Sequence, residues 1–445
     1  MSKSVTDHVC EPVDPTRGLT RGSAWLGNRK CQMVLLAIAV TGASYAGTTL
    51  SPLQETVRES LGLTDDQIAI LQGPVMALPM VAASVPLGLI IDRYKRVRLV
   101  MLFAVCDLLG TILTAVGGGF AVLAFARGLV GFMMLAVNPV AFSLLADLFE
   151  PAHRGRAVMV LTVGQTVGGA AVFASGGILL TLIERGPNAW RTVMLLLAVP
   201  LVPVVLVTLA LREPSRTEVV ISRPSPRQSF AELWRYRRMV VPIIAGVVFA
   251  QTAIGAVFVW TAPVLTRSYA LSSDRVGAVM ALVSLVSGIA GPVVGGFLAD
   301  ACQRFGGPRR TVLALGICAL LAVPAGLFAV APGVPVLTML VVVFTSLLLA
   351  CAVMGNALLT VVVSNEVRGL CLGIFGAISV IFAFGVAPVL VSRISVIIGG
   401  PRMISPAVAV VCAGMTFLTF TVFAAVVNRF PSLTARRAST TKPQA

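Results

Sequence analysis

Residues 335–363 read PVLTMLVVVFTSLLLACAVMGNALLTVVV, and this stretch decides the fold. Its 29 residues include no charged side chain, whereas about 20 apolar residues in a helix are enough to cross the hydrocarbon core of a bilayer. Because no water is present there, the backbone N–H and C=O groups must bond within their own segment. The stretch therefore predicts a transmembrane α-helix.

Eleven further runs share this length and composition, so the sequence predicts an all-α integral membrane protein of twelve transmembrane helices. The other runs are 31–53, 67–91, 99–118, 121–145, 157–183, 192–211, 239–265, 276–299, 311–331, 370–392 and 403–427.

The overall composition agrees with this interpretation. Of the 445 residues, 57% are hydrophobic and only 12% are charged, which is too apolar for a soluble surface. A formal net charge of +16 would suit nucleic acid only if the basic residues formed a soluble face with aromatic side chains between them. Here they lie in short segments between apolar runs, so we expect membrane lipid as a partner and no nucleic acid.

The basic residues also predict the orientation. The segments on one side, including both termini, contain 26 of the 34 Lys and Arg residues, and the segments on the other side contain seven. Cytoplasmic loops are enriched in Lys and Arg, so we expect a multi-pass protein of the cytoplasmic (inner) membrane with both termini cytoplasmic. The first apolar run is too long for the core of a signal peptide, so no cleavage is expected.

Cysteine and histidine usage argues against enzyme chemistry. The eight cysteines are dispersed without Cys-x-x-Cys spacing, and both histidines, His8 and His153, lie outside the predicted spans. No catalytic cluster of His, Cys and Asp is visible in the spans, and no Gly-x-x-x-x-Gly-Lys-Ser/Thr loop is present. We expect no disulfides, no metal, no cofactor and no enzymatic activity.

Several short patterns occur twice, at a nearly constant spacing. The first two pairs are 208 residues apart and the third is 214 apart. They are 63–66 and 271–274 (Leu-Thr/Ser-x-Asp), 88–92 and 296–300 (Gly-x-x-x-Asp), and 154–155 and 368–369 (Arg-Gly). A shared offset at the same place in the topology indicates a duplicated six-helix unit.

The duplication predicts five parts of the chain. These are a cytoplasmic tail (1–30), a six-helix bundle (31–211), a cytoplasmic linker (212–238), a second six-helix bundle (239–427) and a cytoplasmic tail (428–445). Within the linker, Phe230, Leu233 and Trp234 are spaced as on one face of an amphipathic helix at the membrane surface. The seven basic residues of the linker are expected to touch anionic lipid, and a regulatory partner site is the alternative.

The segment GLIIDRYKRVR at 88–98 and its weaker copy GFLAD at 296–300 resemble the signature loop of the major facilitator superfamily. The resemblance implies that family's two-bundle transporter fold, with a solute site between the bundles near the membrane midplane. In the family this loop latches the halves together on the cytoplasmic side, and a plain basic loop that fixes orientation is the alternative. The residues assigned to this latch are Gly88, Asp92, Arg93, Arg96, Asp147, Arg154, Gly296, Asp300, Glu366 and Arg368.

Two charged residues lie inside the apolar runs. Arg127 is expected about 9 Å from the outer end of its helix and Asp107 about 12 Å from the cytoplasmic side, at ~1.5 Å per residue. Arg127 resembles a family arginine that takes part in substrate binding or proton coupling. Because buried charges in a membrane are functional by default, both are assigned to substrate binding or coupling. A fixed ion pair for Arg127 and helix packing for Asp107 are the alternatives.

Further polar side chains in the runs are candidates for the wall of the solute cavity, with bonding between helices as the alternative for each. They are Tyr45, Thr48, Thr49, Gln72, Asn138, Gln165, Gln251, Trp260 and Asn356.

Three other patterns are similar to the spinster-like branch of the superfamily, which exports lipids or other amphipathic solutes. They are Trp260-x-x-Pro263-x-x-x-Arg267, Asp147 with Arg154-Gly155-Arg156, and Asn365-Glu366-Val367-Arg368-Gly369. That branch usually has an acidic residue late in the first helix, where this chain has only the uncharged residues 44–48.

We therefore expect a monomeric secondary transporter that moves a small amphipathic or anionic organic solute by alternating access, coupled to protons. A multidrug or lipid exporter of the same superfamily is one alternative. A channel or a non-transporting membrane sensor is an alternative from another class, although duplicated halves favour a rocking carrier.

Overall fold

Helices make up nearly all of the computed structural model, which describes residues 28–183, 186, 188–214 and 226–430. Most of both predicted tails and the middle of the predicted linker lie outside these ranges. The latch candidates Gly88 and Asp92 lie on the described backbone of α5, but their side-chain surroundings are outside the described part of the chain.

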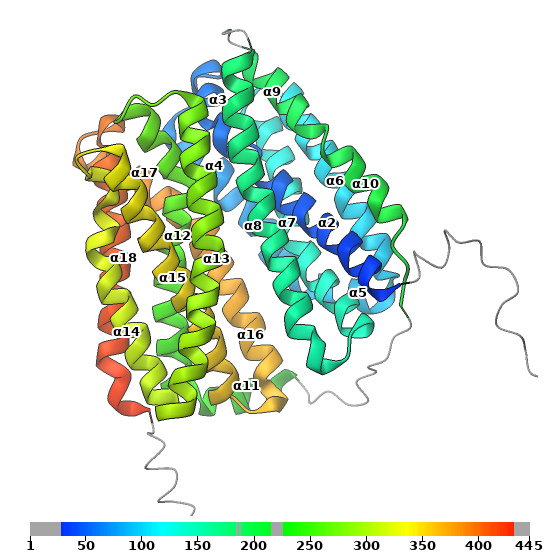
Figure 1. Cartoon of the computed structure of the whole chain (residues 1–445), viewed down its shortest axis with the longest axis vertical. Coiled ribbons are helices and arrows are strands. Elements are labelled where there is room, and N and C mark those ends of the chain that lie inside the picture. The colour runs from blue at the N-terminus through cyan, green and yellow to red at the C-terminus, as the bar shows by residue number, and fades with distance from the viewer. Residues whose placement is uncertain (1–27, 184–185, 187, 215–225, 431–445) are drawn as a thin grey trace, which may run out of the picture.

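The helices form two groups that lie side by side (Figure 1). The first group consists of α2 (Arg29–Thr48), η1 (Ser51–Leu53), α3 (Gln54–Ser60), α4 (Asp65–Gln72), α5 (Pro74–Arg93), α6 (Arg96–Val116), α7 (Phe120–Leu148), α8 (Pro151–Leu182), α9 (Ala189–Ala198) and α10 (Leu201–Leu209). The short helix α11 (Pro226–Arg235) lies within the predicted linker. The second group consists of α12 (Arg237–Arg267), α13 (Ser273–Gly306), α14 (Pro308–Ala325), η2 (Gly326–Val330), α15 (Val334–Val362), α16 (Asn365–Val380), η3 (Ile381–Val386), α17 (Ala387–Ile398), η4 (Pro401–Met403), α18 (Ile404–Val426) and η5 (Val427–Arg429).

Eleven helical stretches in the described residues are long and apolar enough to cross a membrane. The predicted run 67–91 differs, because the structure divides it into α4 and α5 at Gly73. Proline is well placed at the first position of a helix, where its missing N–H has no partner to lose, so Pro74 begins α5. The all-helical membrane fold is confirmed, and the count of twelve spans stays a prediction.

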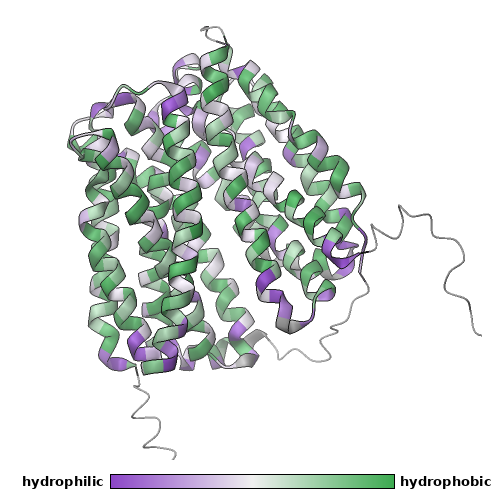
Figure 2. Ribbon diagram, viewed as in Figure 1, coloured by the Kyte–Doolittle hydropathy of each residue, from purple (hydrophilic) through white to green (hydrophobic). Residues whose placement is uncertain are grey.

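Hydrophobic residues run along the whole length of most helices, and hydrophilic residues gather toward the helix ends (Figure 2). Large apolar side chains such as Leu182, Phe297 and Ile397 are mostly exposed. Exposed apolar surface of this extent would be unstable in water, and it suits contact with lipid.

The two ends of the molecule differ in how the halves meet. We call the end that includes α11 and the α5–α6 turn the linker end, and the end that includes α3 and the α12–α13 turn the distal end. At the distal end, Ala69, Ala170 and Phe173 of the first half are part of one buried core with Trp260 and other residues of the second half. Toward the linker end, each half has a core of its own.

Helices α8 and α13 form the longest contact between the halves. They meet near the distal end, where a Cβ atom added to Gly177 would lie 3.0 Å from the Cα of Gly277. Small residues permit such close backbone packing in membranes. The helices stay in contact as far as Thr166 and Gly288, and they lie apart toward the linker end (Figure 1).

A π-helical segment, η3, interrupts the long helix between α16 and α17. Its backbone packs against two glycines from different halves. A Cβ atom on Gly255 would lie 1.9 Å from the carbonyl oxygen of Ala383, and one on Gly73 would lie 2.6 Å from that of Phe384. Single-turn π-segments are rare and are frequent at functional sites, and this one lies where the halves touch.

Candidate functional site

Arg127 on α7 and Asp107 on α6 are both buried within the first half, at 1% and 2% exposure. They are close enough to interact electrostatically. The guanidinium of Arg127 donates to the carbonyl oxygen of Gly47 at 2.7 Å and contacts the sulfur of Met76 at 3.0 Å. Arg127 Nε and Asp107 Oδ1 are buried without a hydrogen-bond partner. The structure thus places a guanidinium and a carboxyl group inside the bundle, and each has a polar atom without a hydrogen-bond partner.

A small polar network lies nearby in sequence on α2, α7 and α8. The side-chain amide of Gln165 donates to that of Asn138, and the hydroxyl of Ser44 donates to the backbone oxygen of Gln165 at 2.9 Å. The hydroxyl of Thr48 donates to the backbone of Ser44 one turn earlier. Ser44 and the candidates Asn138 and Gln165 therefore join three helices of the first half, whereas the bond of Thr48 stays within α2.

The other candidates of the first half are buried toward its distal end. Gln72 donates to Gln54 and accepts from Ser51 at 3.3 Å. Thr49 donates to the backbone oxygen of Ala46. Tyr45 belongs to the buried core that also includes Trp190. In this conformation Gln72 links α4 to the segment 51–54, whereas the bond of Thr49 is local to the end of α2.

The three candidates of the second half have different environments. Trp260 is fully buried, and its indole donates to the backbone oxygen of Pro388 at 3.0 Å, which ties α12 to α17. Gln251 is half-buried on α12. Asn356 is exposed on α15, where its amide donates to the carbonyl oxygen of Ala352. An exposed amide within a spanning helix is expected to face water rather than lipid.

An ion-pair cluster joins the halves at the distal end. Arg267, at the end of α12, forms two-pronged pairs with Glu55 on α3 and Asp65 at the start of α4, with N–O distances of 2.7–2.9 Å. The Glu55 and Asp65 side chains are 15% and 9% exposed. Bidentate, charge-assisted contacts of this kind are among the stronger polar interactions.

A second contact lies beside the first. Asp66 accepts from the hydroxyl of Ser392 at 2.6 Å and is 3.3 Å from the guanidinium of Arg393, both on α17. We call the contacts of Glu55, Asp65 and Asp66 with α12 and α17 the distal seal. Within the described part of the chain, the ion pairs between the halves all belong to this seal.

Sequence reasoning missed the distal seal as a site. Asp66 belongs to a repeated pattern and Arg267 to a family pattern, neither of which indicates an ion pair, and Glu55 belongs to no pattern. The available signal was a concentration of acidic residues at 55–66 facing basic residues at 267 and 393. Partners more than 200 residues apart in sequence cannot be matched without the fold.

At the linker end, Arg96 is buried at the start of α6 and links three segments of the first half. It pairs with Asp147 of α7 and, at 2.9 Å, with Glu213 after α10. Its guanidinium also donates to the backbone oxygen of Ser143. Two assigned latch residues, Arg96 and Asp147, are therefore in direct contact, and Glu213 is a partner that the sequence did not reveal.

The remaining latch candidates are not gathered at one point. Arg154 donates to the backbone oxygens of Ala146 and Phe149, which close the end of α7. Arg368 is half-buried, with Nε lacking a partner. The exposed latch candidates are Arg93, Asp300 and Glu366. Gly296, which has no neighbour within 4 Å of an added Cβ atom, precedes Asp300 by one turn.

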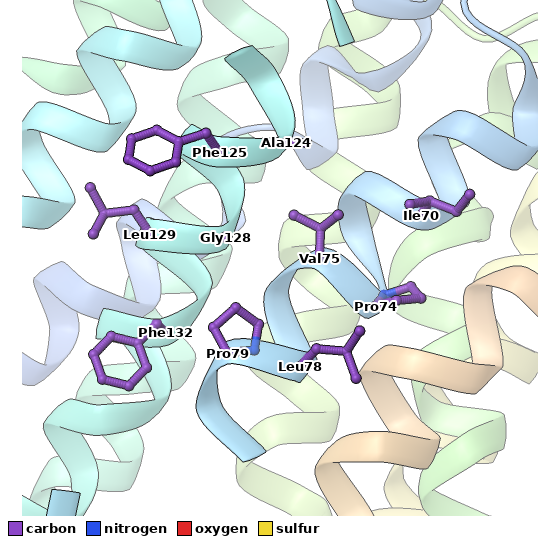
Figure 3. A pocket seen from close by; sticks show the side chains of 10 residues that line it. All are labelled: Ile70, Pro74, Val75, Leu78, Pro79, Ala124, Phe125, Gly128, Leu129 and Phe132. Carbon is purple, nitrogen blue, oxygen red and sulfur yellow. The ribbon is translucent and has the colours of Figure 1, made fainter. Parts of the chain in front are cut away.

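An apolar groove of about 570 Å³ lies on the outer side of the α5–α7 contact, and its lining residues on α7 are close to Arg127 in sequence. Pro74, Val75 and Leu78 line one wall and Phe125 and Phe132 the other (Figure 3). No charged side chain lines it, so it suits only an apolar occupant such as lipid.

Sequence comparison places these features among transporters. Residues 35–265 match the profile described as Major Facilitator Superfamily. A "Probable 4-methylmuconolactone transporter" of Cupriavidus pinatubonensis is 24% identical over 260 residues, which are 58% of this chain and 59% of that protein. An "MFS-type efflux pump" of Mycolicibacterium smegmatis is 25% identical over 285 residues, 62% and 63% of the two chains. The matches span about six tenths of the length of these relatives.

Solved structures share the fold over more of the chain. A bacterial homolog to the human lysosomal transporter Spinster, in an inward-facing and unoccupied conformation, superposes with a TM-score of 0.75 at 20% identity, covering 90% of this chain and 95% of that one. A D-xylose-proton symporter superposes with a TM-score of 0.67 at 15% identity, covering 88% and 97%.

Proposed function

Because the chain belongs to the major facilitator superfamily and is a transporter rather than an enzyme, we propose that it moves a small amphipathic or anionic organic solute by alternating access, coupled to protons. The site lies between the halves and includes Arg127 and Asp107, with Asn138, Gln165, Gln251 and Asn356 as polar wall residues.

One observation supports this proposal most directly: within the residues that the structure describes, the halves share a buried core and ion pairs at the distal end and not at the linker end. At the distal end, Phe173 packs into the core of the second half, and the distal seal adds charge-assisted bonds. Toward the linker end the cores are separate. A carrier that alternates requires two such ends that close in turn.

The helix boundaries support two six-helix repeats and hence twelve spans. Thr64 and Ser272, which are 208 residues apart, are the N-caps of α4 and α13. Gly119 and Gly333 are the N-caps of α7 and α15 with nearly the same extended backbone. These agreements favour the predicted bundles 31–211 and 239–427, joined by the linker 212–238.

The buried pair suits both the solute and the coupling. A guanidinium with an unused N–H can bind a carboxylate or another oxygen anion. A buried carboxyl near a positive charge can change protonation when the charge is engaged elsewhere. An anionic solute on Arg127 would weaken the attraction between Arg127 and Asp107 and so favour a proton on Asp107.

The relatives suggest two solute classes. The named muconolactone transporter favours a small organic acid, whereas the named efflux pump favours a multidrug exporter as the second candidate. The buried guanidinium of Arg127, which can bind a carboxylate, supports the first. The same proposal places both termini and the linker end in the cytoplasm, which is supported by the distribution of basic residues, and includes a monomeric state.

The function can be tested with purified protein in liposomes that contain a pH-sensitive dye. We expect added 4-methylmuconolactone to cause proton movement and an imposed pH gradient to drive its accumulation. Ethidium, a lipophilic cation, serves as the probe for the multidrug alternative. Asp107→Asn should abolish the response to the gradient and retain counterflow, because the amide cannot titrate. Gradient-driven transport by that variant at the wild-type rate would exclude Asp107 as the coupling group.

A second variant tests Arg127. Loss of one charge-assisted hydrogen bond costs about 1.5–3 kcal/mol, so Arg127→Ala should weaken solute binding roughly 10- to 150-fold. Arg127→Lys keeps the charge and should retain part of the affinity. The measurement is solute affinity by ligand-dependent thermal stability in detergent. Equal affinity in the wild type and a folded Arg127→Ala variant would make the arginine purely structural.

A further inference from the structure

A second apolar cavity lies at the linker end, away from the proposed site. It has a volume of about 460 Å³, within the roughly 300–1,000 Å³ typical of small-ligand pockets. Helix α11 provides Phe230 and Trp234, α12 provides a face that includes Ala245, and the inner end reaches Phe382 of η3. We call this cavity the α11 groove. Its walls are apolar except at its mouth.

The mouth of the α11 groove is basic. Arg237 lines it, lies 5.2 Å over the Trp234 ring and donates to the backbone oxygen of Trp234 at 3.1 Å. Arg235 and Arg238 are its neighbours in sequence, and all three arginines are exposed. The acidic residue of α11, Glu232, accepts from the hydroxyl of Ser364 at 2.9 Å. The groove therefore combines an apolar interior with positive charge at one end.

The location of the groove determines which molecule is available to fill it. Arg237 begins a membrane-spanning helix, and Trp234 and Phe230 are largely exposed. Aromatic and basic residues at a helix end lie at the lipid–water boundary. A phospholipid at this boundary offers an acyl chain for the apolar interior and a phosphate for the arginine fork.

We propose that the α11 groove is a binding site for an anionic phospholipid of the surrounding membrane. One acyl chain lies between α11, α12 and α16, and the phosphate lies against Arg237 and its basic neighbours. Because the acyl chain reaches Phe382 of η3, the lipid contacts the segment whose backbone packs against Gly73 of the other half. Occupancy of the groove thus acts on the junction between the halves.

Native mass spectrometry of delipidated protein tests this assignment. Phosphatidylglycerol should bind more tightly than phosphatidylcholine with identical acyl chains, and Arg237→Gln should lower its affinity about fivefold. Ala245→Trp should fill the groove and reduce binding of both lipids. Arg98→Gln removes an exposed charge from α6 at the same end and is the matched control, with unchanged binding. If Ala245→Trp does not fold, Val241→Trp fills the groove from an exposed position.

Three outcomes would overturn the proposal. The first is equal binding of the two lipids by the wild type, and the second is retention of lipid by a folded groove-filling variant. The third is competition by soluble glycerol phosphate as strong as by phosphatidylglycerol, which would indicate a free phosphate site instead. Amide hydrogen exchange tests how deeply the acyl chain inserts. Phosphatidylglycerol should slow exchange at 381–386 in the wild type and not in Ala245→Trp. Identical exchange in both proteins would contradict insertion to Phe382.

Discussion

Gly131 lies one helical turn after Arg127 and sets how closely α5 approaches α7. A Cβ atom at this position would lie 2.5 Å from the Cβ of Met76. The sulfur of Met76 in turn contacts the Arg127 guanidinium. The absence of a side chain at 131 thus permits the contact that completes the surroundings of the buried arginine.

Gly131→Ala should therefore destabilise the first half, by about 1–3 kcal/mol as for other overpacked cores. The added methyl group must push Met76 away, so solute affinity should fall together with stability. Thermal unfolding in detergent measures the first effect and ligand-dependent stabilisation the second. Gly414→Ala on α18, where an added Cβ atom has no neighbour within 4 Å, is the control and should be neutral or slightly stabilising. Equal stability of the two variants would contradict the steric argument.

At the scale of elements, the decisive feature is the meeting of two irregular helices. The first half breaks at Gly73 between α4 and α5, and the second half widens into the π-helical η3. At Gly73 the nearest atoms to an added Cβ are backbone oxygens of Ala69 and Phe384, both at 2.6 Å. Backbone atoms cannot rotate away as a side chain does, so this contact tolerates no substituent.

Gly73→Ala is therefore expected to separate η3 from the α4–α5 break and to lower stability more than Gly131→Ala does. It should also change transport, because the contact joins the halves. Unfolding temperature and counterflow rate are the measurements. Gly376→Ala on α16, with no neighbour within 4 Å, is the matched control. Wild-type counterflow by a folded Gly73→Ala variant would show that the junction is not part of the transport cycle.

The sequence indicates the helix break at Gly73 better than it indicates the π-segment η3. Gly73-Pro74 is a recognisable helix interruption, yet the uninterrupted apolar run 67–91 favoured a single helix. The π-segment at 381–386 has a weaker signal, because Gly385 within it and Pro388 after it are set in a long apolar run that fits an ordinary helix. Its geometry depends on packing against Gly255 and Gly73, which lie far away in sequence.

At the scale of the whole molecule, the distal seal determines which end is closed. Arg267→Gln removes the charge-assisted bonds to Glu55 and Asp65. We expect a net loss of about 1.5–3 kcal/mol, the range for one such bond, because these side chains are partly exposed and water compensates for part of the loss. The balance between the two conformations should then shift roughly 10- to 150-fold toward a shape with the distal end open.

The shift can be measured as the distance between spin labels at exposed positions Glu59 on α3 and Ile397 on α17, in a cysteine-free background. We expect a longer-distance population in Arg267→Gln. Arg402→Gln removes an equal charge from the exposed α17–α18 connection and should leave the distribution unchanged. A distance distribution identical to that of the wild type in both variants would mean that the apolar core alone closes the distal end.

The same scale shows how much could be predicted from the sequence. Apolar runs and repeated patterns predicted the helical membrane fold, because lipid imposes one rule on every segment. Arg127 and Asp107 were recognised because charges are rare in such runs, and both are buried on adjacent helices. Two ion pairs were not predicted, namely Arg267–Glu55 and Arg96–Glu213. Each joins charged residues of predicted loops that lie far apart in sequence and meet only in the folded chain.

The α8–α13 contact has a mechanical consequence, because it extends from the Gly177–Gly277 crossing as far as Thr166 and Gly288. From Gly288 to the end of α13 at Gly306 the helix continues for roughly 27 Å at ~1.5 Å per residue, and this part acts as a lever whose fulcrum lies at the end of the contact. A tilt of only about 10° around that fulcrum displaces the far tip by roughly 5 Å. A slight swivel of the helix thus opens an aperture as wide as a small metabolite.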